Sequence, residues 1–398
     1  MLESVEAKRS ARRLKSRGPT FCCAMVVGMT ISSTGACQKL DTSEQGSSIV
    51  IDHEVLVPGL SGKPNAMAQL TGGGFVLVGA HGAAWAAGTD AQGKLLWKYE
   101  EPLDPNVKTQ NQSEFHGVVP LANGGALLCG EIYTKDYEAG LLLILDSSGR
   151  AVERLTALPN NDRSMFASSF MACFSWGKGI AVTGVGADGH KGFAWLVKLN
   201  KDGVKEWEKF DAELPGINGV ALADNSLILM GSPTGLEGVT VASLNQKGVL
   251  VASNKTKYLD ARPVRSVGPP SVTKLLAVDS RNGNILVTLN GDLQEIGTGK
   301  RVGPPSIRDG CAYTLTDGSV VLFGNRAGSV YRSAIGWINR GGRGDEVREM
   351  PVPIQQDASF SMRDAVSLSA NQFVAMRDQV SSINPANTGV VLSWVTFK

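Results

Sequence analysis

The feature that most constrains the fold is a short pattern that recurs along residues 60–398. In each copy, a turn residue is followed by an apolar run, and the copy closes six positions later, usually in glycine. The copies are Gly73 to Gly79, Gly124 to Gly130, Lys178 to Gly184, Asn225 to Gly231, Gly318 to Gly324 and Asn371 to Arg377, with a weaker one at residues 283–291. Because most copies are about 50 residues apart, the chain is predicted to be an array of structural repeats.

A second pattern follows most copies. It consists of an apolar run, a turn that ends in glycine and, in two cases, a tryptophan four residues after that glycine, namely Trp97 and Trp207. The turns at residues 146–149 and 245–248 lack the tryptophan. Apolar runs bounded by Gly, Asn and Asp are typical of β-strands joined by tight turns. Each repeat is therefore predicted to contain four strands. We interpret the two tryptophans as packing between repeats rather than as a docking motif.

Four strands in a repeat of this length are typical of a propeller blade. We therefore predict an all-β, seven-bladed β-propeller, with six or eight blades left open. Residues 179–210 resemble the Gly-rich propeller repeats of bacterial secreted proteins and lipoproteins, and residues 297–302 look like a quinoprotein-type repeat. The resemblance implies an architecture and no activity, because the vicinal cysteines of quinoprotein dehydrogenases are matched only by Cys22-Cys23, outside the repeats.

Two parts of this array depart from the regular four-strand repeat. The fifth repeat is predicted to be a minimal blade with strands at residues 275–278, 285–289 and 293–296. Residues 254–271 are predicted to be a long loop before it. The last repeat lacks a fourth strand, and the segment Ile49–Val57 belongs to no other repeat. We predict that this segment completes the last blade, because closing the ring removes an open sheet edge.

The N-terminus is predicted to be an export signal. Basic residues within 7–17, an apolar stretch at 21–31 and small residues at 32–36 form the secretory pattern, and the apolar stretch is too short for a permanent membrane span. Residues 34–37, Thr-Gly-Ala-Cys, resemble the lipobox of bacterial lipoproteins. The resemblance implies cleavage before Cys37, lipid on Cys37 and, with Gln38 following, sorting to the outer membrane. A plain signal peptide with an incidental cysteine is the alternative.

These observations divide the chain into three predicted parts. Residues 1–36 are the signal peptide, residues 37–48 are a polar tether, and residues 49–398 are the propeller. The corresponding location is the cell envelope, on the periplasmic side of the outer membrane, with the lipid as the membrane anchor.

Composition and missing motifs exclude several functions. The 398 residues contain 39 Lys+Arg against 37 Asp+Glu, which disfavours a dedicated nucleic-acid binder. The sequence contains no HExxH, GxSxG or P-loop motif and no cluster of Cys and His, so we expect no metal site and no cofactor. Cys129, Cys173 and Cys311 lie in apolar runs and are predicted to be free thiols, with one disulfide left open.

The candidate binding face follows from the predicted blade. The long loops all lie on the face opposite the tight turns, and long loops on a rigid scaffold are where binding residues gather. Each innermost strand starts on that face, next to the central channel. The candidate residues at these starts are Asn65, His116, Ser169, Asn218, Arg308, Asp309, Arg363 and Asp364. Arginine and aspartate in such a ring can bind an acidic or polar group through charge-assisted hydrogen bonds.

We therefore expect a non-enzymatic, monomeric, lipid-anchored propeller that binds or scaffolds an envelope or exported protein through its long-loop face. Two alternatives stay open. One is a small-ligand site or a hydrolase- or lyase-type enzyme in the channel, which would bring His116 and Asp309 within hydrogen-bond reach. The other is an immunity lipoprotein that blocks a toxin in the periplasm, motivated by the lipobox and the binding face together.

Overall fold

A computed structural model describes residues 49–398 except 108, 110–111, 158–166, 188–191, 212–213, 215–217, 222–224, 232–237, 259, 268–272, 280–282, 298, 302–306, 327–331, 339–345, 351–357 and 382–388. The sequence predictions for residues 1–48, including Cys37, therefore lie outside the described residues. The described chain forms β-strands, and no helix in it is long and apolar enough to cross a membrane.

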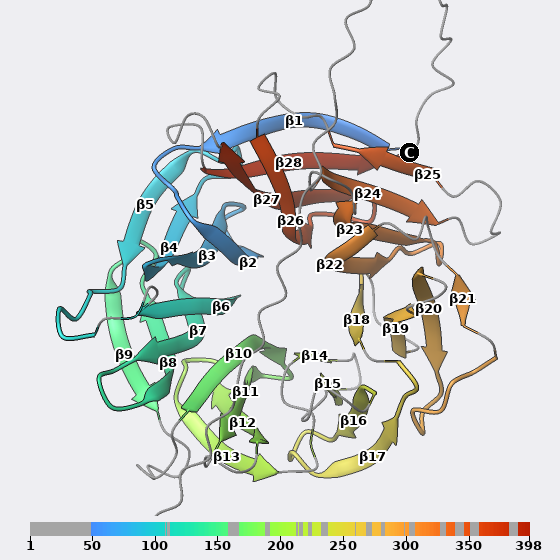
Figure 1. Cartoon of the computed structure of the whole chain (residues 1–398), viewed down its shortest axis with the longest axis horizontal. Coiled ribbons are helices and arrows are strands. Elements are labelled where there is room, and N and C mark those ends of the chain that lie inside the picture. The colour runs from blue at the N-terminus through green and yellow to red at the C-terminus, as the bar shows by residue number, and fades with distance from the viewer. Residues whose placement is uncertain are drawn as a thin grey trace, which may run out of the picture. The chain divides into compact units, whose positions relative to one another are not determined.

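The first four blades are antiparallel four-stranded meanders arranged around a centre (Figure 1). Blade 1 has β2 (Lys63–Gln69), β3 (Phe75–His81), β4 (Ala83–Thr89) and β5 (Leu95–Glu100). Blade 2 has β6 (Ser113–Pro120), β7 (Ala126–Tyr133), β8 (Glu138–Leu145) and β9 (Ala151–Ala157). Blade 3 has β10 (Ala167–Trp176), β11 (Gly179–Ala187), β12 (Gly192–Asn200) and β13 (Lys205–Asp211). Blade 4 has β14 (Asn218–Ala221), β15 (Leu227–Gly231), β16 (Thr240–Leu244) and β17 (Leu250–Lys255).

Three further blades complete the ring. Blade 5 has β18 (Asp260–Ser266), β19 (Thr273–Asp279), β20 (Gly283–Leu289) and β21 (Lys300–Arg301). Blade 6 has β22 (Ile307–Thr314), β23 (Val320–Arg326), β24 (Arg332–Ile338) and β25 (Glu346–Glu349). Blade 7 has β26 (Ala358–Ser367), β27 (Gln372–Ser381), β28 (Gly389–Phe397) and β1 (Ile49–Val57).

Blades 5 and 6 are joined into one eight-stranded sheet. Their innermost strands β18 and β22 pair in parallel, with Val264 opposite Ala312. The described strands therefore form six hydrogen-bonded sheets that comprise seven four-stranded units. The predicted seven-bladed propeller is confirmed.

The N-terminal strand closes the ring as predicted. Strand β1 pairs antiparallel with β28, with Ile49 opposite Phe397, in a sheet ordered β1-β28-β27-β26. Glu54 of β1 contacts the guanidinium of Arg377 on β27 and accepts a hydrogen bond from Ser393 Oγ at 2.6 Å. Two distant parts of the chain are thus joined by backbone pairing and by an ion pair whose guanidinium is buried.

The strand order predicted for blade 5 was wrong, because the innermost strand was missed and each later strand was counted one position too early. Its innermost strand, β18, lies inside the expected loop 254–271, and the expected second strand is in fact the third, β20. Residues 293–296 are not a strand, although Glu295 forms an isolated bridge with Leu289. The cause is the turn after β20. Leu293 takes the left-handed conformation, with φ of 60°, at the position where other blades have glycine, so the turn was not recognised in the sequence.

The two tryptophans pack between blades, as predicted. A Cβ on Gly149, in a turn of blade 2, would lie 2.4 Å from the ring of Trp97 in blade 1. A Cβ on Gly248, in the same turn of blade 4, would lie 2.5 Å from the ring of Trp207 in blade 3. Each indole therefore covers the turn of the next blade, and each glycine is required by that close approach.

Candidate functional site

A β-bulge recurs at the same level of the innermost strands, close to where each begins. The register shifts there in five described strands: at Asn65, His116, Met171, residues 309–310 and Arg363. A bulge leaves one residue outside the ladder and redirects its side chain. The bulges therefore place Asn65, His116 and Arg363 at the start of the channel, where the sequence predicted binding residues. Met171, and not Ser169, occupies the equivalent place in β10.

A glycine faces the bulge from the second strand in blades 1 to 3. In blade 2, a Cβ on Gly130 would lie 1.9 Å from the carbonyl oxygen of Glu114. The recurring glycine seen in the sequence is therefore needed because the bulged backbone approaches it closely.

The centre of the ring contains a cavity of about 650 Å³. Four predicted residues line it, namely Asn65, His116, Arg363 and Asp364, together with Arg262 and Arg265 of β18. The volume lies within the usual range for small-ligand pockets. The side chains of Asn218, Arg308 and Asp309 lie outside the described part, and their backbones belong to β14 and β22.

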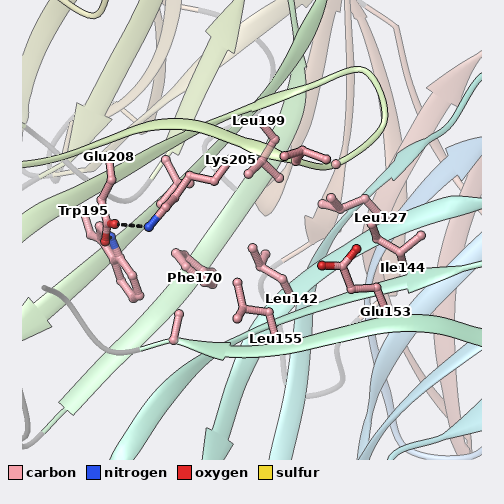
Figure 2. A pocket seen from close by; sticks show the side chains of 14 residues that line it. Leu127, Leu142, Ile144, Glu153, Leu155, Phe170, Trp195, Leu199, Lys205 and Glu208 are labelled. Carbon is pink, nitrogen blue, oxygen red and sulfur yellow. Dashed lines mark hydrogen bonds and ion pairs between the residues drawn. The ribbon is translucent and has the colours of Figure 1, made fainter. Parts of the chain in front are cut away.

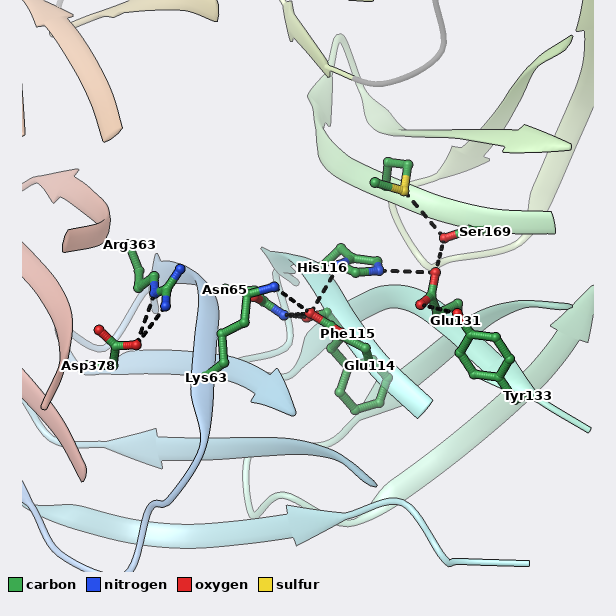
Figure 3. Close-up of polar contacts among 11 residues, drawn as sticks. Lys63, Asn65, Glu114, Phe115, His116, Glu131, Tyr133, Ser169, Arg363 and Asp378 are labelled. Atoms are coloured by element: carbon green, nitrogen blue, oxygen red, sulfur yellow. Dashed lines mark hydrogen bonds and ion pairs between the residues drawn. The ribbon is translucent and has the colours of Figure 1, made fainter. Parts of the chain in front are cut away.

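The first cluster at the channel is built around Glu131 of β7 and ties three blades together (Figure 3). Ser169 Oγ, from blade 3, donates a hydrogen bond to Glu131 Oε2 at 2.6 Å, and Tyr133 donates to Oε1 at 3.1 Å. His116 Nε2 lies 3.3 Å from Glu131 Oε2, at an ion-pair distance. On the other side, Asn65 Nδ2 of blade 1 donates to Glu114 Oε1 at 2.8 Å. The polar side chains of this cluster therefore bind one another across the blade interfaces.

Glu131 and the neighbouring Glu138 of β8 have different proton affinities. Burial alone would raise the pKa of Glu131, but the contact with His116 and the hydrogen bond from Ser169 outweigh it and lower this pKa below its ordinary value. Burial and the nearby charge of Glu131 raise the pKa of Glu138 to about 7. One carboxyl is thus ionised while its neighbour titrates near neutral pH.

The second cluster is built around Asp364 of β26, which is buried. Arg265 Nη1 donates to Asp364 Oδ1 and to the hydroxyl of Tyr313, both at 3.0 Å. The backbone N–H of Met67, from blade 1, donates to Asp364 Oδ2 at 3.1 Å. Nearby, Arg363 Nη2 donates to Asp378 Oδ2 at 2.7 Å (Figure 3). Asp364 therefore links blades 5, 7 and 1.

The walls of the cavity carry different charges. Arg262 and Arg265 lie on β18, and β18 and β6 stand on opposite sides of the ring (Figure 1). On the β6 side, His116 lines the cavity and Glu114 and Glu131 lie beside it. The channel thus offers guanidinium groups from one wall and a histidine backed by carboxylates from the other.

Sequence reasoning missed the residues that hold the channel start in place. Glu131, Asn325 and Asp378 each come directly after the residue that closes the second-strand pattern. Each bonds to an innermost strand: Glu131 to Ser169, Asn325 to the backbone of Met362, and Asp378 to Arg363. A polar residue at this repeat position was the available signal. Arg265 was missed as well, because it lies on β18, within residues 254–271 that were predicted to be a loop.

The three cysteines of the propeller are unpaired, with Cys129 buried and Cys173 and Cys311 partly buried. Burial and the charge of Asp364 raise the pKa of the Cys311 thiol to about 12. Cys311 is therefore protonated at neutral pH and is a poor nucleophile. Among the described residues, no group of three or more His, Cys, Asp and Glu could hold a metal ion.

Neither a protein-family model nor a curated protein sequence matches this chain. Solved structures show its fold. An unknown-function protein from Dyadobacter fermentans is 8% identical, with 88% of this chain and 100% of that chain covered and a TM-score of 0.50. BBS1N in complex with ARL6DN is 10% identical, with 88% and 97% covered and a TM-score of 0.51. A chain of the mitotic checkpoint complex is 8% identical, with 94% and 99% covered and a TM-score of 0.54.

The protein is a β-propeller, and bacterial proteins of unknown function are among its structural relatives.

Proposed function

We propose that the protein is a non-enzymatic binding module that holds an envelope or exported protein at the channel face, where the innermost strands begin. The observation that carries the proposal is the ring of bulged polar residues around an open cavity of about 650 Å³. The ring is rigid, because Glu131 and Asp364 tie it across several blades. A rigid surface loses little conformational entropy when a partner binds.

The arginines around the cavity indicate the chemistry of the bound group. Arg262, Arg265 and Arg363 all line the cavity. Guanidinium groups bind carboxylates in a favourable planar geometry. We therefore propose that the partner inserts an acidic side chain or its C-terminal carboxylate into the channel.

Structural relatives support protein binding in general terms. The BBS1N propeller is in complex with ARL6DN, and another relative belongs to the mitotic checkpoint complex. Because the sequence identities are 8–10%, this support concerns what the scaffold can do and does not indicate a partner.

The partner can be sought by affinity capture from the native envelope followed by mass spectrometry. The double variant Arg262→Glu with Arg363→Glu is expected to lose the captured protein, because it reverses the charge of two residues that line the cavity. The control is Arg150→Glu, in the tight turn between β8 and β9 on the opposite face, which should capture as the wild type does. Unchanged capture by the double variant would contradict the proposed face. Recovery of a toxin would specify the immunity alternative.

We also propose that residues 1–36 are a signal peptide and residues 37–48 a tether, with lipid on Cys37 anchoring the propeller to the outer membrane. The motif at residues 34–37 supports this proposal. Cys37→Ala should move the protein from the membrane fraction to the soluble fraction, because a lipid anchor would have no attachment point. Membrane association that survives the substitution would argue against lipidation.

A second candidate, acid–base chemistry in the channel, is favoured by the separated proton affinities of Glu131 and Glu138. One contact disfavours nucleophilic catalysis: the Ser169 hydroxyl donates to Glu131 rather than to His116. Glycoside and ester substrates can be screened with the wild type and with Glu131→Gln. Turnover that falls at least about a hundredfold in the variant would establish the enzymatic alternative.

A further inference from the structure

The outer strands of blades 1 to 4 share one position, which holds tryptophan in blades 1 and 3, Ala252 in blade 4 and a charged residue in blade 2. Trp97 lies opposite Gly88 in blade 1, and Trp207 lies opposite Lys198 in blade 3. At the same register in blade 2, Glu153 lies opposite Ile144. In each of these strands the pairing shifts one step before this position, which confirms that the three residues are equivalent.

The tryptophans show what this position does. Trp97 covers Gly149 in the turn of blade 2, and Trp207 covers Gly248 in the turn of blade 4. The equivalent turn of blade 3 has Gly203, but no indole covers it. Its nearest neighbours are Ile144 and Leu127 of blade 2.

A cavity of about 160 Å³ remains between blades 2 and 3, at the place that an indole fills elsewhere (Figure 2). We call it the indole slot. Its walls are mainly apolar and are formed by Leu127, Leu142, Ile144, Leu155, Phe170 and Trp195. Engineered apolar cavities of about 150 Å³ accept one benzene molecule, so the slot is large enough for an aromatic ring.

The charged residues at the slot indicate which group of the ligand lies next to its aromatic ring. Glu208 accepts a hydrogen bond from Trp195 Nε1 at 2.9 Å and another from Lys205 Nζ at 2.7 Å, so its oxygens are occupied. Glu153 lines the slot, is exposed, and has no hydrogen bond or ion pair with any described residue. Its carboxylate therefore complements a donor or a cation on the occupant.

The strand beside the slot is also uncovered. Strand β9 is the outer strand of its sheet, and Val152 and Leu155 are 67% and 47% exposed. The residue equivalent to Leu155 in blade 1 is Tyr99, which is only partly exposed. An exposed edge strand with apolar side chains can pair with an extended peptide.

We propose that the indole slot binds the aromatic side chain of a partner peptide, with a basic residue next to that side chain pairing with Glu153. The peptide lies along β9 as an added strand. This site is separate from the channel face and does not depend on the function proposed for that face. We infer an aromatic occupant because the tryptophans of blades 1 and 3 fill the same position in those blades.

The probes are N-acetyl-Trp-Lys-amide and N-acetyl-Trp-Glu-amide, titrated into the full-length protein and measured by calorimetry. The wild type should bind the lysine probe about tenfold more tightly than the glutamate probe, because a charge-assisted contact contributes about 1.4 kcal/mol. Glu153→Trp should fill the slot, weaken binding of the lysine probe at least about tenfold and raise the unfolding midpoint by about 2 °C. Ala157→Leu provides a second blocking variant from the other end of the slot.

Two controls separate the slot from the surface around it. Val152→Trp adds the same indole to the same strand at an exposed position outside the slot, and it should bind both probes as the wild type does. Glu153→Gln should lose the preference for the lysine probe. The proposal is overturned if the wild type binds neither probe, or if Glu153→Trp and Ala157→Leu bind the lysine probe with wild-type affinity. A loss in Val152→Trp equal to that in Glu153→Trp would also overturn it.

Discussion

At the residue scale, the channel depends on two adjacent positions of the second strand. The first is a glycine, such as Gly130, because the bulged innermost strand brings a carbonyl oxygen against it. The second holds Glu131, Asn325 or Asp378, whose side chains bond to an innermost strand. The glycine makes room for the bulge, and its neighbour fixes the side chains that the bulge redirects.

Replacing Gly130 with alanine should destabilise the protein strongly. The new Cβ would lie 1.9 Å from the Glu114 carbonyl oxygen, so the backbone has to shift. We expect a loss of about 3 kcal/mol in the free energy of unfolding, measured by denaturant titration. Gly72→Ala is the matched control, because nothing lies within 4 Å of its Cβ position. Equal effects of the two substitutions would contradict the close approach.

Glu138 should make stability depend on pH. Its pKa is raised from 4.5 to about 7, so the folded protein holds this proton more tightly than the unfolded chain does. The resulting stabilisation is complete below about pH 4.5 and is lost as the pH rises through about 7. Glu138→Gln, which cannot ionise, should flatten this part of the stability profile. Asp136→Asn, at an exposed site of the same hairpin, should leave the profile unchanged.

At the element scale, the outer strands decide how blades meet. Trp97 and Trp207 cover the turns of the following blades, whereas β9 presents Glu153 and leaves a slot. Strand β1 is a special case, because it comes from the other end of the chain. It brings Glu54 to Arg377, whose side chain is fully buried.

Removing the Glu54 carboxylate should weaken the closure of the ring. Glu54→Ala takes an ion-pair partner from the buried Arg377 guanidinium, and such a loss costs about 3 kcal/mol of unfolding free energy. Asp52→Ala removes only an exposed contact with Thr396 and should cost less than about 0.5 kcal/mol. Thermal unfolding of both variants checks the prediction, and equal midpoints would contradict it.

At the scale of the whole molecule, each blade is covered by its neighbours, and the last blade needs the first segment of the propeller. Contacts from Asp364 to Met67 and from β1 to β28 join the two ends of the propeller chain. A ring of this kind should unfold in one cooperative transition, because opening any interface exposes the flanks of two blades.

Deleting residues 1–57 should therefore abolish cooperative unfolding, since blade 7 would lose its outer strand and β28 would become an open edge. Deleting residues 1–48 retains β1 and should leave the thermal midpoint within about 2 °C of the full-length value. Calorimetry distinguishes the two outcomes. A sharp, unshifted transition after removal of β1 would show that closure does not stabilise the ring.

The fold was largely predictable, because its turns have a local chemical signature. Gly73, Gly124 and Gly318 all take positive φ at the predicted turns. The failure in blade 5 has the same origin, since Leu293 adopts that conformation without being glycine. Leu293 is buried, and its burial compensates for a conformation that leucine otherwise avoids.

The candidate site was only partly predictable. Asn65, His116, Arg363 and Asp364 were placed correctly at the channel, because counting from a turn fixes a position along a strand. Glu131 and Arg265 were not recognised as parts of the site. Their partners, Ser169 and Asp364, lie in other blades and are distant in sequence.

The sequence alone determined the repeat, the strand alternation and the closing role of Ile49–Val57, because these depend on turn residues and on apolar runs a few positions apart. Only the tertiary structure decided which side chains meet at the channel and which blade interface keeps an open slot. Both depend on how neighbouring blades pack. In the sequence, Glu153 is indistinguishable from an ordinary exposed residue. Only the structure shows that it occupies the position at which two other blades have an indole.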